Sequence, residues 1–206
     1  MSEATEAEAL HTFLRTRRSV RRFLSEPVSK EVIERILESA SYAPSSHDVQ
    51  PWRFAVLPAG ETRDRLAAAM STELRRDLLS DGSDELEIEK RIRASRERLR
   101  GAPAAVLLCL DGRSVDVYSD ERRRAAAYMM AAQSVAAAGL QLLLAAHAEG
   151  LAGVWVCSPL FAPQAVKTAL ELPPSWEPEA MFYLGYGEAD RVRKVVRPLD
   201  EITVWM

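Results

Sequence analysis

The spacing of apolar residues along the chain predicts six helices. In most of these stretches apolar side chains recur every three or four positions, which places them on one face of a helix. Serine, aspartate or proline marks several expected starts, and proline or glycine follows several expected ends. The expected helices cover residues 6–16, 30–42, 61–79, 85–100, 120–148 and 163–171.

Four further apolar runs are shorter and lack this period, as expected of buried strands. Glycine, proline or aspartate bounds several of them. The expected strands cover residues 53–57, 104–110, 151–157 and 180–187. No internal repeat and no polar linker divides the chain, so we expect one domain over residues 1–206.

The longest expected element, residues 120–148, carries no formal charge from Ala125 to Ala148 unless His147 is protonated. Its length would permit a membrane span. We expect a core helix instead, because alanine dominates, glutamine and serine interrupt the run, and no second span accompanies it. A chain of this size has little with which to surround such a helix. We therefore expect a homodimer with this helix in the interface.

Composition and charge narrow the function classes. The chain has 206 residues, of which 48% are hydrophobic, so it can bury a sizeable core. A formal net charge of -3 gives no general attraction to nucleic acid or to an anionic membrane. The two cysteines form no CxxC motif, and the three histidines lack metal-ligand spacing. We expect no metal site and a cytoplasmic location.

Candidate chemistry begins at a cluster of five arginines that surrounds Ser19, between residues 15 and 22. Arginine binds phosphate through paired, charge-assisted hydrogen bonds. A folded chain could bring a second basic run to the same phosphate, and two separate solvated faces are the alternative. The second run contains Arg191, Arg193, Lys194 and Arg197.

A polar turn joins the expected helix 30–42 to the first expected strand. Its sequence is Ala43-Pro-Ser-Ser-His-Asp-Val-Gln-Pro-Trp52. Hydroxyls, amides and backbone donors of this kind suit the edge of a heterocycle. An ordinary helix-to-strand connection would use the same turn formers. Together, the arginines and the turn would suit a phosphorylated ligand that carries a ring.

The order and spacing of these pieces resemble the FMN-dependent nitroreductase family. The matching residues are Arg17-Arg-Ser-Val-Arg21-Arg-Phe23, Pro27-Val28, Ala43-Pro44-Ser45-Ser46 and Gln50-Pro51-Trp52. The resemblance implies an α+β fold with a central, mostly antiparallel sheet flanked by helices. It also implies an intertwined homodimer around the long helix, in which the apolar tail, 198–206, adds a strand to the partner's sheet. In the family, the region corresponding to residues 85–100 covers the substrate pocket, so this charged helix is either a lid or a plain surface helix.

The resemblance also assigns roles to single residues. Arginines of the first motif, with a basic residue just before Pro198, would contact FMN, and the polar turn would lie around its ring and ribityl chain. The implied cofactor-binding residues are Arg17, Arg18, Ser19, Arg21, Ser45, Ser46, Asp48, Gln50, Lys194 and Arg197. Asp48 departs from the asparagine common in relatives, and an ionised carboxylate only accepts hydrogen bonds. Either Asp48 turns toward an arginine, or its charge lowers the flavin potential.

The implied activity is that of an FMN-dependent oxidoreductase. It would use NAD(P)H to reduce a nitroaromatic, quinone or similar conjugated substrate by a ping-pong mechanism, with the flavin carrying the chemistry and no catalytic side chain. The second half of the chain, including Trp155-Val-Cys-Ser-Pro-Leu-Phe161, resembles the flavin domain fused to the deazaflavin-coenzyme γ-glutamyl ligase. Two alternatives therefore stay open. One is a reductase of a dehydro precursor of the deazaflavin coenzyme, and the other is a flavin- or deazaflavin-binding module without turnover.

Overall fold

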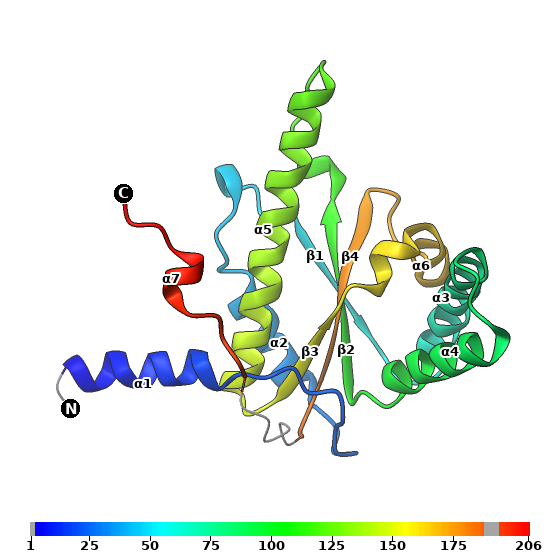
Figure 1. Cartoon of the computed structure of the whole chain (residues 1–206), viewed down its shortest axis with the longest axis horizontal. Helices are drawn as coiled ribbons and strands as arrows, with labels where there is room; N and C mark the ends of the chain where they lie inside the picture. Colours follow the sequence, from blue (N-terminus) through cyan, green and yellow to red (C-terminus); the bar gives the residue numbers. More distant parts are fainter. Residues whose placement is uncertain (1–2, 188–193) are drawn as a thin grey trace.

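The computed structural model describes residues 3–187 and 194–206 of the chain. Its centre is a four-stranded sheet in the order β1-β2-β4-β3, in which each neighbouring pair is antiparallel (Figure 1). This arrangement confirms the expected α+β fold with an antiparallel sheet. The strands are β1 (Trp52–Leu57), β2 (Ala104–Asp111), β3 (Ala152–Val156) and β4 (Trp176–Gly185).

Helices cover both faces of this sheet. Helices α2 and α5 pack on one face, whereas α3, α4 and α6 lie on the other (Figure 1). Helices α1 and α7 project from the side of the molecule that carries α5. The helices are α1 (Glu3–Thr16), α2 (Lys30–Ala40), α3 (Glu61–Ser80), α4 (Glu85–Arg100), α5 (Glu121–Ala148), α6 (Pro163–Leu170) and α7 (Leu199–Ile202).

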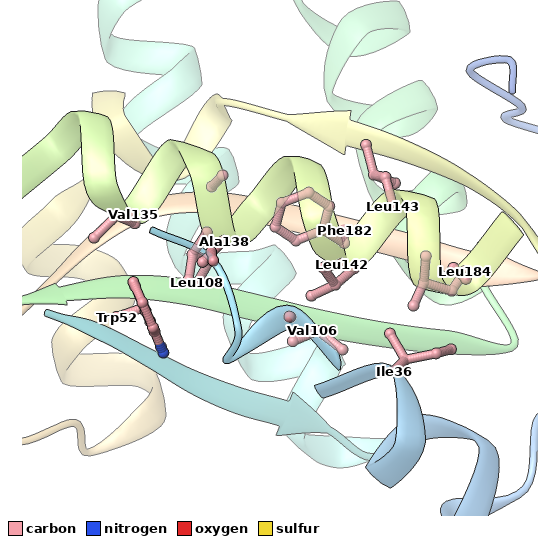
Figure 2. Close-up of a cluster of buried hydrophobic side chains, with 14 of the residues drawn as sticks. Ile36, Trp52, Val106, Leu108, Val135, Ala138, Leu142, Leu143, Phe182 and Leu184 are labelled. Atoms are coloured by element: carbon pink, nitrogen blue, oxygen red, sulfur yellow. The ribbon is translucent and has the colours of Figure 1, made fainter. Parts of the chain in front are cut away.

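The side chains of the central strands point alternately to the two faces of the sheet, and this divides the core into two layers. In β2, Val106 and Leu108 face the layer of α2 and α5, whereas Leu107 and Cys109 face the layer of α3 and α6. Successive strand side chains point to opposite faces, so a strand with helices on both sides must be apolar throughout. Figure 2 shows the first layer, in which side chains of α5 interdigitate with those of the sheet.

The long helix α5 is covered on one face only within this chain. Val135, Ala138 and Leu142 are almost fully buried against the sheet, whereas Met129 and Leu140 are more than half exposed. By length and composition α5 could cross a membrane, but its buried face belongs to the main core of the protein. The expected core helix is therefore buried on one side within this chain, and an apolar face of it stays open.

Strand β4 begins at Trp176, four residues before the expected start at residue 180. Proline lacks a ladder donor and usually marks an edge or a bulge. The β2–β4 register shifts between Leu108 and Cys109, and Pro178 pairs with Cys109 at this bulge. The bulge accommodates the proline inside a central strand, which the local sequence did not indicate.

Helix α4 is packed as one arm of a hairpin with α3. Its apolar stripe, formed by Ile88, Ile92 and Leu99, is buried. The hairpin lies on the face of the sheet opposite α5 (Figure 1). These contacts favour the surface-helix interpretation of residues 85–100 over a lid.

The two ends of the described chain leave apolar side chains uncovered. Leu10 and Leu14 of α1 are at least half exposed, and Trp205 in the tail is 93% exposed. The tail forms the short helix α7, and residues 203–206 pair with no strand of this chain. Its addition to a partner's sheet therefore stays a prediction. Arg191 and Arg193 lie outside the described residues.

Candidate functional site

The arginine motif lies across the ends of two strands. Ser19 forms a parallel bridge with Gly153 at the start of β3, and the Val20 N–H donates to the Gly153 carbonyl at 3.0 Å. Farther along, the Leu24 N–H donates to the Tyr186 carbonyl, just beyond β4, at 2.8 Å. These backbone bonds hold the motif beside the C-terminal end of α5.

A cavity of about 210 Å³ opens beside this motif. Arg17 contributes a guanidinium nitrogen, Nη1, that is buried without a hydrogen-bond partner among the described residues. Burying a charged donor without a partner is costly, so this atom requires a partner, which a bound anion or a water molecule can supply. The cavity is lined by Thr16, Arg17, Arg18, Val20, Leu143, His147, Gly150, Leu151, Ala152, Gly153 and Gly187.

The other arginines of the cluster differ from Arg17. Arg18 turns back on its own chain, because its Nη1 donates to the carbonyls of Arg15 and Arg17, the latter at 2.8 Å. It thus satisfies one carbonyl in the last turn of α1 and one just beyond its end. Arg21 and Arg22 are exposed, as is Ser19. Only Arg17 combines a buried charge with the cavity.

His147, near the end of α5, was not among the expected site residues. Its ring stacks on Phe13 with centroids 4.8 Å apart, and its Nε2 lies 3.1 Å from the Thr16 hydroxyl. These contacts fix the end of α1 against α5 directly before Arg17. The sequence signal that could have pointed to His147 was its place in the last turn of the longest helix, three residues before Gly150. Gly150 adopts a left-handed conformation after the helix ends.

The polar turn is attached to the middle of α5. The Ser46 N–H donates to the Ser134 hydroxyl at 3.2 Å, and the Ser46 hydroxyl lies 3.8 Å from the Met130 sulfur. Residues 46–48 form a short 3-10 helix. Ser45 and Ser46 are half-buried, whereas Asp48 and Gln50 are exposed.

Three residues of this turn adopt left-handed backbone conformations. The φ angles are 52° at His47, 55° at Asp48 and 48° at Gln50. Histidine and aspartate tolerate this region better than most residues, whereas glutamine does so less often. Each such residue costs on the order of 1–3 kcal/mol unless the surrounding structure compensates.

Gln50 is held by three of its polar groups. Its N–H donates to the Ser45 hydroxyl at 3.1 Å, its side-chain amide donates to Asp48 Oδ1 at 3.1 Å, and its carbonyl accepts from Arg53 Nη1 at 3.0 Å. Among the described residues, Asp48 therefore pairs with an amide and with no arginine. Of the two alternatives raised for Asp48, the structure disfavours the pairing with an arginine.

A buried carboxylate is linked to the turn through Arg53. Asp111, at the end of β2, is 1% exposed, and its Oδ2 lies 3.0 Å from Arg53 Nη2. Arg113 also binds this carboxylate through two nitrogens, at 3.1 and 2.7 Å. Hydrogen bonds from Arg113 hold the pKa of Asp111 well below its ordinary value.

The expected cofactor residues thus form two groups on one long helix. The turn lies at Ser134 and the arginine cavity lies at His147, which is about 20 Å farther along α5 at the rise of an α-helix. Lys194 and Arg197 are exposed and bond to no other described residue. Within the described ranges, no group of three or more His, Cys, Asp or Glu side chains could hold a metal ion.

Comparisons with known proteins identify relatives of the chain. A model of the nitroreductase family matches residues 14–186. YfhC of Bacillus subtilis, named as an NAD(P)H nitroreductase-type protein, is 29% identical over 198 residues, covering 94% of this chain and 93% of its own. The 5,6-dimethylbenzimidazole synthase of Rhodospirillum rubrum is 28% identical, covering 87% and 82%. A nitroreductase-type structure from Desulfovibrio desulfuricans, in complex with FMN, superposes with a TM-score of 0.72 at 29% identity, over 96% of each chain.

Proposed function

The chain belongs to the nitroreductase family, and we propose that it passes electrons from NAD(P)H through bound FMN to a nitroaromatic, a quinone or a similar conjugated acceptor. The family makes the chain an FMN-dependent oxidoreductase. The nucleotide, the acceptor and the roles of single residues are proposals. Bound FMN supplies the redox chemistry, because it accepts hydride from a nicotinamide and gives electrons to the acceptor.

The unpaired nitrogen of Arg17 is the observation that carries the proposal. A phosphate brings a charge of about -1.5 to -2 and three acceptor oxygens, which would satisfy the buried Nη1. We assign Arg17 to the phosphate, with Ser19 and Arg21 as neighbours on the same segment. Arg18, Lys194 and Arg197 would add positive charge, and the exposed side chains of the last two are free to turn toward the ligand.

The polar turn is the proposed site of the flavin ring. Ser45, Ser46, Asp48 and Gln50 present hydroxyl, carboxylate and amide groups on a segment held by hydrogen bonds. The uracil-like edge of a flavin alternates carbonyl acceptors with one N–H donor. An amide that donates and a carboxylate that accepts suit such an edge.

We also propose a homodimer in the cytoplasm. The uncovered face of α5, helix α1 and the tail expose large apolar side chains, and contiguous apolar surface of this kind marks an interaction site. A second copy would cover these surfaces together. Light scattering at micromolar concentration measures the molar mass and so distinguishes the dimer from a monomer.

The acceptor separates the candidate functions. A dehydro precursor of the deazaflavin coenzyme is the second candidate acceptor, and the similarity of residues 155–161 to the ligase-fused flavin domain is the observation that favours it. A binding module without turnover would hold a flavin that NADH and NADPH both fail to reduce.

The first test is the absorption spectrum of the purified protein, followed by chromatography of any small molecule that heating releases from it. We expect a yellow protein that releases FMN. Anaerobic addition of NADH or NADPH should then bleach the flavin, and air, a quinone or a nitroaromatic should restore its colour. A colourless protein that fails to take up added FMN would contradict the proposed function.

A further inference from the structure

We propose that Arg53 and Asp111 position the ring-binding turn, so that this ion pair, which we place outside the ligand site, sets the affinity and potential of the flavin. The proposal rests on the proposed function for the identity of the ring. The anchoring of the turn by the pair can also be measured without the flavin. We call these two residues the anchor pair.

The turn needs an external anchor because its own sequence does not favour its shape. It has left-handed backbone angles at three positions, and none of these residues is a glycine. Gln50 is the least suited of them, because it lacks the short polar side chain that helps Asp and Asn adopt this region. Left to local preferences, the segment would populate other conformations.

The anchor pair binds three successive carbonyls, beginning with that of the last left-handed residue, Gln50. Arg53 Nη1 donates to the carbonyl of Gln50 at 3.0 Å and to that of Trp52 at 2.7 Å. The carbonyl between them, on Pro51, accepts from the Asp111 N–H at 2.8 Å. Because a carbonyl direction fixes the peptide plane, these bonds determine how the chain leaves the turn.

Asp111 determines where Arg53 points. Its carboxylate is 1% exposed and receives Arg53 Nη2 at 3.0 Å, while the Arg53 side chain is 34% exposed. A planar guanidinium held at one nitrogen by a buried carboxylate has its other nitrogen directed toward the carbonyls. Arg113 binds the same carboxylate but is 72% exposed and donates to no atom of the turn.

The turn connects the anchor pair to the proposed ligand. Gln50, whose carbonyl is held by Arg53, donates its side-chain amide to Asp48. Movement of the Gln50 peptide would therefore move both side chains that we place at the ring. Arg53 and Asp111 are positioning residues, and the effect of changing them should appear at the ring end and not at the phosphate end.

Arg53→Gln tests the proposal, and Arg113→Gln is the matched control because it removes the other arginine from the same carboxylate. We expect amide hydrogen exchange of residues 46–50 in the flavin-free protein to rise at least tenfold in Arg53→Gln and to stay within twofold of wild type in Arg113→Gln. We also expect Arg53→Gln to weaken both FMN and riboflavin binding by about tenfold. The midpoint potential of its bound FMN should differ from that of wild type.

A second variant covers failure of the first to fold. Arg53→Lys keeps the charge opposite Asp111 but has one nitrogen in place of a planar fork, so it cannot hold the carboxylate and the carbonyls through separate nitrogens. Its exchange rates should lie between those of wild type and Arg53→Gln. Equal exchange rates, affinities and potentials in the Arg53 and Arg113 variants would overturn the proposal. Failure of wild type to bind FMN would instead overturn the proposed function, and unchanged exchange in both Arg53 variants would still refute the anchor.

Discussion

Gly139 of α5 lies directly against the ring of Trp155 on β3. A Cβ atom at position 139 would be 2.6 Å from the Trp155 Cζ3 and 2.9 Å from the Phe182 Cζ. Trp155 and Phe182 meet edge to face, with centroids 4.9 Å apart. The glycine lets the helix approach the sheet closely enough for both rings to pack beneath it.

Gly139→Ala should therefore destabilise the protein although alanine favours helices. Overpacking costs about 1–3 kcal/mol, and the gain in helix propensity is at most about 1 kcal/mol. We expect the melting temperature to fall by a few degrees, as measured by circular dichroism. In a Trp155→Leu background the same substitution should cost less, because only the close contact with Phe182 remains. Equal losses in both backgrounds would contradict the contact.

Arg17→Ala should weaken FMN binding by about 10–100-fold, because a hydrogen bond to a charged group contributes about 1.5–3 kcal/mol. Riboflavin lacks the phosphate, so its affinity should change little. Fluorescence titration of both ligands measures this difference. Arg22→Ala, an exposed change on the same segment outside the cavity, is the control. An equal loss of affinity for FMN and riboflavin would contradict the assignment of Arg17 to the phosphate.

Asp111→Asn should lower stability at neutral pH, and by a smaller amount at acid pH. The folded-state pKa of Asp111 is depressed, so its stabilising effect is present above the unfolded value of about 3.9 and fades as the pH falls below that value. We expect a loss of about 1–3 kcal/mol at pH 7, within the range for a broken buried pair with partly exposed partners. Urea unfolding at pH 7 and pH 3 measures the difference in unfolding free energy between wild type and Asp111→Asn. A stability difference that is larger at pH 3 than at pH 7 would contradict the ion pair.

The two cysteines should react at very different rates. Cys109 is buried in β2, and desolvation raises its pKa to about 12, whereas Cys157 is exposed. The thiolate is the reactive form. We expect one thiol to react quickly with a disulfide reagent in the native protein and two in denaturant. Cys157→Ser should abolish the fast reaction, and a persistent fast phase would show that Cys109 is accessible.

Asp48→Asn should raise the midpoint potential of bound FMN. An ionised carboxylate at the proposed ring site disfavours added negative charge, and asparagine still accepts the bond from Gln50. A Coulomb difference of about 1–2 kcal/mol corresponds to roughly 20–40 mV for a two-electron couple. Equilibration with redox dyes measures the shift. Asp81→Asn, at the end of α3 on the other face of the sheet, should leave the potential unchanged.

The sequence determined the elements and the two site motifs because both are encoded locally. Periods of three to four residues located the helices other than the short α7, and the expected helix 85–100 matches α4 to the residue. The apolar runs located the strands, apart from the early start of β4. The basic cluster and the polar turn were readable as ligand-binding segments, since arginine, serine and amide chemistry needs no knowledge of the fold.

Only the tertiary structure decided how these pieces meet. The register of β1 on β2, which pairs Trp52 with Leu110, brings Asp111 beside Pro51 and within reach of Arg53. Packing of α5 against the end of α1 brings His147 to the cavity of Arg17. Such contacts join residues more than fifty positions apart, and strand register and helix packing determine them. A local pattern records which face of an element is apolar, but it does not record what that face will meet.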